Sequence, residues 1–123
     1  MQPELYFDIS SVESGGSLYR VISKEGHESF IYHHSTYDVY TDDIKVFQTA
    51  YSSFTAFWEE LTKDPQWFYM HALYVHPEQR SFIAEQLKNV DWQIQGDRKW
   101  QESHQRQWKK VLTDPKDYYN PLK

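Results

Sequence analysis

The sequence contains no cysteine and only four glycines among its 123 residues. Without thiols the chain can form no disulfide, no thiolate zinc site, no iron–sulfur cluster and no cysteine nucleophile. Phosphate-cradling glycine loops, dinucleotide fingerprints and serine-nucleophile motifs are also missing. The motifs therefore indicate no cofactor and no catalytic residue.

Long hydrophobic stretches are lacking as well. No apolar run approaches the roughly 18 residues that cross a bilayer as a helix. The opening residues, Met1-Gln2-Pro3-Glu4, have no basic region followed by an apolar one, as a signal peptide would. The sequence thus predicts a cytoplasmic protein that does not enter the membrane, with secretion by a route that needs no cleaved signal as the alternative.

Aromatic side chains, in contrast, are abundant and make up 18% of the residues. Ten tyrosines, seven phenylalanines and five tryptophans can build a core even though aliphatic side chains are few. A chain of this length has room for one core, so we predict a single domain over residues 1–123.

The net charge of −5 is unevenly distributed along the chain. Residues 1–95 carry fourteen acids and six bases, whereas residues 96–123 carry four acids and seven bases. An acidic body repels nucleic-acid phosphates, so we expect no nucleic-acid partner. The same charge suits a protein partner with a basic surface, and it also favours solubility.

Alternating apolar and polar residues predict strands between about residues 4 and 51. Leu5, Phe7 and Ile9 alternate with polar neighbours, and further strands are expected at 18–22, 30–33 and 44–51. Alternation in the last of these is imperfect, which favours burial on both faces. Short turns at 13–16 and 24–27 require antiparallel pairing.

Helical spacing appears from residue 53 onward. One apolar stripe at i, i+3, i+4 and i+7 predicts a helix over about 53–63, with Ser52 or Ser53 as its cap: Phe54, Phe57, Trp58 and Leu61. A short strand at 72–75 leads to a second helix over about 77–89, since Pro77 is favourable at a first helical position. A third helix is predicted over about 97–113, followed by a tail at 114–123.

Strands followed by helices are typical of an α+β fold. We predict an antiparallel sheet of four to five strands, with about three helices packed mainly on one face. The other face is expected to display tyrosines, drawn from Tyr6, Tyr19, Tyr32, Tyr37 and Tyr40.

The six histidines do not form a recognised metal-binding spacing. His33 and His34 are adjacent on a predicted strand and so point to opposite faces. His104 lies on the apolar stripe of the third helix, where packing explains it. Carboxylate–histidine pairs can be assembled on paper, but 18 acids and six histidines provide such pairs in any fold. We therefore predict no metal site.

The segment 37–43 mixes rigid aromatic rings with carboxylates, a composition that suits an interface with a basic partner. The candidate partner-binding residues are Tyr37, Asp38, Tyr40, Asp42 and Asp43. An acidic surface loop, with its tyrosines packed on its own sheet, would account for each of these residues taken singly. The basic residues of the third helix, for their part, are accounted for by a solvated cationic face.

The stretch Phe54-x-x-Phe57-Trp58-x-x-Leu61-Thr62, followed by Val75-His76-Pro77-Glu78, resembles small bacterial toxin-immunity proteins. Size, acidity, the lack of cysteine and the order of elements are similar to that antitoxin-type class. The resemblance implies a bacterial protein that binds and blocks a toxin without catalysis, and it implies no particular site residue.

The sequence as a whole predicts a non-catalytic protein-binding domain, an immunity or inhibitor protein that neutralises a basic toxin or enzyme. The alternative is a small enzyme or ligand-binding domain with a pocket between the sheet and the helices.

Overall fold

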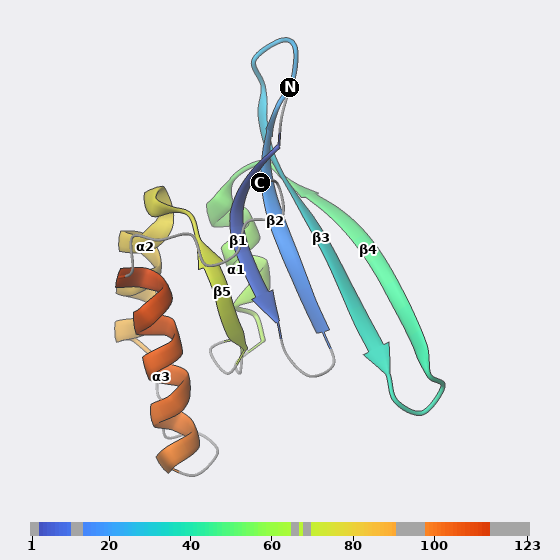
Figure 1. Cartoon of the computed structure of the whole chain (residues 1–123). Helices are drawn as coiled ribbons and strands as arrows, with labels where there is room; N and C mark the ends of the chain where they lie inside the picture. The colour runs from blue at the N-terminus through green and yellow to red at the C-terminus, as the bar shows by residue number, and fades with distance from the viewer. Residues whose placement is uncertain (1–2, 11–13, 65–66, 68–69, 91–97, 114–123) are drawn as a thin grey trace.

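The computed structural model describes residues 3–10, 14–64, 67, 70–90 and 98–113, with Ser14 and residues 98–101 described by their backbone alone. Five strands form one sheet in the order β4-β3-β2-β1-β5, and all neighbours are antiparallel. The strands are β1 (Glu4–Ser10), β2 (Ser14–Ile22), β3 (Glu28–Asp38), β4 (Asp43–Tyr51) and β5 (His71–Val75). The helices are α1 (Phe54–Leu61), α2 (Pro77–Lys88) and α3 (Arg98–Thr113) (Figure 1).

Local signals explain where two of the helices begin. Ser53 caps α1, because its side-chain oxygen accepts a hydrogen bond from the Ala56 N–H at 3.1 Å. Pro77 starts α2, and the imidazole Nδ1 of His76 accepts the Glu78 N–H at 3.1 Å. The serine cap and Pro77 were predicted from the sequence, whereas the capping role of His76 was not.

The core lies against one face of the sheet, which we call the helix-covered face. Phe7, Leu18 and Tyr32 share this face because they are direct cross-strand partners. Phe57 of α1 packs its ring edge-to-face on Phe7 at 5.8 Å and on Tyr32 at 4.9 Å. Ile83 of α2 joins the same buried cluster. The predicted α+β fold, with an antiparallel sheet and three helices, is thus confirmed.

The third helix covers the β5 edge of the sheet. Figure 1 shows α3 lying along β5, far from β4. The Gln107 side-chain amide donates to the Ala72 carbonyl at 2.8 Å, and Trp108 is buried beside Phe7 with ring centroids 6.3 Å apart. His104 is also buried, as its place on the apolar stripe predicted. Among the described residues, every helix is too short or too polar to cross a lipid bilayer.

Two of the tyrosines expected on the open face are buried on the helix side. Tyr6 is 2% exposed because the register of β1 shifts between Leu5 and Phe7, a bulge that places its ring against Phe30 at 5.3 Å. Tyr32 is 8% exposed because it is in register with Leu18. Of the five candidate tyrosines, these two are therefore not displayed on the open face.

The expectation that strand 44–51 is buried on both faces was also wrong. β4 is an edge strand whose residues are exposed from Asp43 to Gln48, because α2 and α3 lie toward the opposite edge of the sheet. β3 is longer than expected, reaching Asp38, and pairs with β4 over its whole length. The predicted tail at 114–123 lies outside the described residues.

Candidate functional site

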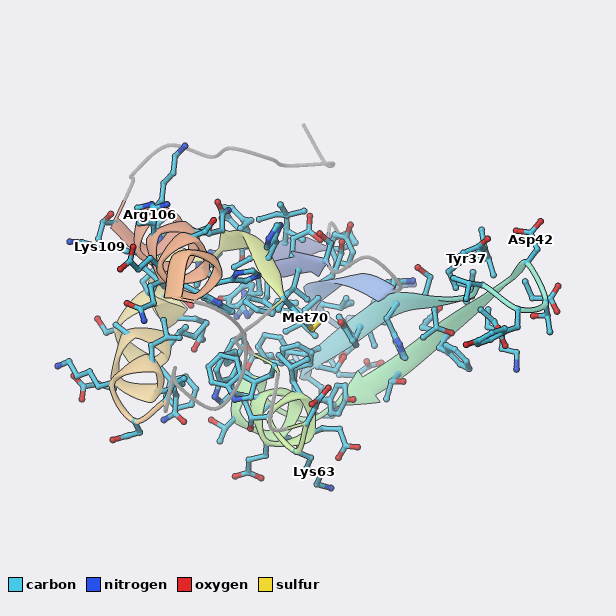
Figure 2. All side chains as sticks on the ribbon, turned by 90° about the horizontal axis from the view of Figure 1, so that it is seen from below. Tyr37, Asp42, Lys63, Met70, Arg106 and Lys109 are labelled. Atoms are coloured by element: carbon cyan, nitrogen blue, oxygen red, sulfur yellow. The ribbon has the colours of Figure 1, made fainter. Side chains whose placement is uncertain are left out.

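The strands β3 and β4 form a hairpin that extends beyond the rest of the sheet. Among the described residues, the pairing of β2 with β3 ends at Ser14 and Thr36, and from Tyr37 onward β3 is paired there with β4 alone. We call residues 35–47 the β3–β4 arm. Figure 2 shows its tip, with Tyr37 and Asp42, projecting away from the helices. The arm thus offers two faces and the β4 edge for contact.

Large apolar side chains are exposed along this arm. Tyr40 is 95% exposed, Val46 75% and Ile44 69%. Tyr37 and Ile44 are direct cross-strand partners, and Val46 follows two residues later, so these three share one face. Contiguous exposed apolar residues with a polar rim are typical of an interaction site.

The arm tip is held by its own hydrogen bonds. The Tyr37 hydroxyl donates to the Asp42 carboxylate at 2.7 Å, and the Tyr40 N–H donates to the Asp38 carboxylate at 2.9 Å. Asp42 itself has a φ of 56°, in the left-handed region that aspartate tolerates better than most residues. The hydrogen bond to Asp42 raises the pKa of Tyr37, because it favours the neutral phenol.

All five residues predicted to bind a partner lie at this tip. Asp38 ends β3, Asp43 begins β4, and Tyr40 and Asp42 lie in the turn between them. A shallow hollow of about 360 Å³ is found here, lined by Thr36, Tyr37, Asp38, Val39, Tyr40, Asp43 and Lys45. Binding of a partner at this tip stays a prediction.

The apolar part of the arm was not predicted from the sequence. Ile44 and Val46 were assigned to a buried strand, yet both are exposed. One signal could have identified them. Lys45 lies between them and Asp43 precedes them, and charged residues at such positions are typical of an edge strand.

A second candidate site is a cavity between α1 and the helix-covered face of β3 and β4. Its volume is about 430 Å³. Aromatic and apolar side chains form its inner wall: Tyr32, Tyr51, Phe57, Leu61, Trp67 and Met70. Polar residues complete the lining: His34, Ser35, Thr36, Thr49, Glu60 and Asp64, with Gly15 beside them. Met70 lies near the centre of the molecule, between the sheet and α1 (Figure 2).

Burial shifts the pKa of three titratable groups in this cavity. Burial lowers the pKa of His34, which favours its neutral imidazole, and the Nε2 of that ring lies 3.3 Å from the Thr49 hydroxyl. Burial raises the pKa of Tyr32 to about 12 and also raises that of Tyr51. Burial thus favours the uncharged form of all three groups.

The remaining histidines do not assemble into a metal centre in the part of the chain that the structure describes, where no group of three histidine, aspartate or glutamate side chains is close enough to hold an ion. His76 Nε2 lies 3.0 Å from a Glu4 carboxylate oxygen, and the imidazole stacks on Tyr6. His71 and His104 have ring centroids 4.9 Å apart. These contacts account for the three side chains by packing and capping.

Two basic residues of α3, Arg106 and Lys109, lie at the other end of the molecule from the arm (Figure 2). Arg106 and Lys109 are exposed on α3, while Trp108 and Val111 are buried on its opposite side. This is the arrangement of an ordinary amphipathic helix with a cationic outer face.

Comparisons with protein-family models, with curated proteins and with solved structures find no match to this chain.

Proposed function

We propose that this protein is a non-catalytic binding module that binds a basic protein partner through the β3–β4 arm. The observation that carries the proposal is the exposure of Tyr40, Ile44 and Val46 on an arm that also bears three aspartates. A folded monomer gains nothing by holding these apolar groups in water. Their burial against a partner would remove that cost.

The two kinds of side chain have separate tasks in this proposal. Aromatic and aliphatic groups supply the energy of a buried interface centre, where few residues dominate affinity. Carboxylates at the rim attract a basic surface and raise the association rate. Asp42 and Asp43 therefore act on encounter, and Tyr40 and Ile44 act on the lifetime of the complex.

The narrower proposal is that this binding inhibits a basic toxin or enzyme, as in an immunity protein. It is supported by the sequence resemblance, by the acidic charge of residues 1–95 and by the fact that the arm stands apart from the core. A projecting, acidic hairpin can enter and block a basic active-site cleft without changing its own fold.

The test begins with a photo-crosslinking amino acid in place of Tyr40, used to capture the partner in a lysate of the source cell. Purified partner is then measured by surface plasmon resonance. Asp42→Asn with Asp43→Asn should slow association and flatten its salt dependence. Tyr40→Ala should weaken binding by about 2 kcal/mol, mainly through faster dissociation. If the partner is a toxin or enzyme, the wild-type arm should inhibit it in proportion to binding.

Matched controls distinguish the effect of the arm on binding from the effect of the overall charge. Glu25→Gln with Glu59→Gln removes the same number of charges at exposed positions outside the arm. This double variant should bind as the wild type does. A partner whose binding is unaffected by the arm variants but is lost on Arg106→Ala with Lys109→Ala would place the interface on α3 and contradict the proposal.

A further inference from the structure

The outer edge of β4 is unpaired in the described part of the chain. β4 stands at the end of the strand order β4-β3-β2-β1-β5, and Figure 1 shows no other described element beyond it. Its residues pair with β3 in unbroken register, without a bulge, and include no proline. The backbone N–H and C=O groups along such an edge are a template for the addition of another strand.

The opposite edge of the sheet is protected from such an addition. β5 has only five residues, and its register with β1 shifts between Asp8 and Ile9. α3 lies along β5, where the Gln107 side-chain amide donates to the Ala72 carbonyl at 2.8 Å. Short strands, irregular pairing and a covering helix are common means of blocking edge-to-edge association. β4 has none of these three.

Apolar side chains are exposed on both faces of β4. Ile44 and Val46 lie on the face away from the helices, as described above. Phe47 lies on the other face, is 43% exposed, and stacks on His34 with ring centroids 5.1 Å apart. A strand added at this edge would cover all three apolar side chains from the side, so hydrophobic burial would accompany the new backbone hydrogen bonds.

The residues of β4 are complementary to those of a second, antiparallel β4. A two-fold axis at Phe47 pairs the whole strand with its copy, because four residues of β4 precede Phe47 and four follow it. In this register Asp43 of one copy lies opposite Tyr51 of the other, and Lys45 lies opposite Thr49. No like charges oppose each other. An axis at Asp43 or at Lys45 would instead place two aspartates or two lysines in direct opposition, which is destabilising.

The acidic arm tips do not prevent this pairing. With the axis at Phe47, the two Asp43 residues lie eight positions apart along the paired strands. At roughly 3.4 Å per residue this separation is about 27 Å. The Debye length at physiological ionic strength is only about 8 Å, so repulsion between the two tips is largely screened.

We propose that two copies of this chain pair through their β4 edges, antiparallel and about a two-fold axis at Phe47. The two five-stranded sheets then form one continuous sheet. Opposed side chains of antiparallel strands lie on the same face, so the helices of both copies cover the same side. β4 supplies fewer than the roughly 20–30 residues that each partner contributes to a standard interface, so the dimer is weak and concentration-dependent.

Sedimentation equilibrium of the full chain, from about 1 to about 500 μM, tests the pairing. The chain should show a monomer–dimer equilibrium with a dissociation constant of about 100 μM or tighter. Phe47→Lys places two lysines at the axis and should weaken the dimer about tenfold or more. Ser81→Lys adds the same charge at an exposed position of α2 and should leave the dimer unchanged. Circular dichroism of both variants checks that the fold is kept.

Single cysteine variants test the register, because the chain has no cysteine of its own. Phe47→Cys brings two thiols together at the axis, where the Cα atoms lie within the roughly 4.4–6.8 Å that a disulfide spans. Ile44→Cys places the two thiols six positions apart along the paired strands, about 20 Å. Mild oxidation should therefore crosslink Phe47→Cys about tenfold faster or more, although Ile44 is the more exposed residue.

Three results would overturn the proposal. The first is a chain that stays monomeric at about 500 μM, and the second is a dimer that Phe47→Lys leaves unchanged. The third is crosslinking of Ile44→Cys as fast as that of Phe47→Cys. None of these measurements uses a partner protein, so the dimer is tested independently of the function proposed for the arm.

Discussion

Trp58 is the residue on which the aromatic core most depends. It is 2% exposed and contacts the rings of Phe7, Phe54, Trp67 and Phe82 at centroid distances between 4.9 and 6.2 Å. We expect Trp58→Ala to lower the free energy of unfolding by about 3–5 kcal/mol, because the cavity left behind cannot collapse among rigid rings. Chemical denaturation measures this directly, and a loss below about 1 kcal/mol would contradict the packing described.

A conservative variant at the same position isolates a second effect. The indole N–H of Trp58 is buried and finds no hydrogen-bond acceptor among the described residues. Trp58→Phe removes this donor together with part of the ring. We therefore expect it to cost much less than Trp58→Ala, because the lost burial is offset by relief of an unpaired polar group.

Asp8 should make the free energy of unfolding fall as the pH rises, which is the opposite of the usual effect of a carboxyl group. Burial raises the pKa of this carboxyl, although the Ser17 hydroxyl donates to it at 2.9 Å. The folded state thus binds a proton more readily than the unfolded state, and between pH 3.8 and the raised pKa stability falls as pH rises. We expect Asp8→Asn to be more stable than the wild type at pH 7, with the difference vanishing near pH 3.

Denaturation curves of the two proteins across this pH range test the prediction for Asp8. Ser17→Ala supplies the opposite case, because it removes the hydrogen bond that favours the carboxylate and should lower stability at pH 7. An Asp8→Asn protein less stable than the wild type at pH 7 would show that the ionised carboxylate is favoured by the fold.

At the scale of elements, the pairing of β2 with β3 depends on Gly16. A Cβ there would lie 2.5 Å from the Tyr32 ring, whereas a Cβ at Gly15 would come no closer than 3.3 Å to any atom. Because Tyr32 is buried under Phe57, we expect Gly16→Ala to cost about 1–3 kcal/mol, as overpacking does. Gly15→Ala should cost less. Equal losses in thermal denaturation would mean that Tyr32 can move aside.

The elements themselves could be predicted from the sequence to a large extent. The stripe from Phe54 to Leu61, the serine cap and Pro77 placed α1 and α2 correctly because these signals act within a few residues. The face of Tyr6 could not be predicted, since a bulge reverses the alternation without a local signal. The exposure of β4 depends on which side the helices pack, and strand periodicity contains no such information.

The two candidate sites differ in how far they could be predicted from the sequence. The arm tip was predicted because tyrosine and aspartate are concentrated in one short segment, residues 37–43. The cavity residues come from separate parts of the chain, and Tyr32, Thr49, Glu60 and Met70 are examples. Their proximity is a product of topology, so the sequence could suggest a pocket between sheet and helices but could not name its lining.

At the scale of the whole molecule, we predict a fold that does not require metal. No group of metal-ligating side chains is found in the described part of the chain, and the stability of a structural metal site is coupled to ion binding. The melting temperature should be the same with and without a strong chelator, as measured by differential scanning calorimetry. A fall of many degrees that zinc reverses would contradict this prediction.

The order of strands in the sheet has a consequence for the route by which the chain folds. β1 to β4 pair with neighbours in sequence, so each hairpin closes over a short loop, whereas β5 joins β1 across more than sixty residues. During synthesis β1 therefore has one unpaired edge until β5 and α3 leave the ribosome. We expect pulse-labelled hydrogen exchange to protect the β2–β3 amides first and the β1–β5 amides last. Over that interval the core side chains of β1, among them Phe7 and Ile9, are not yet covered. They avoid aggregation only if the chain folds quickly or is bound by chaperones.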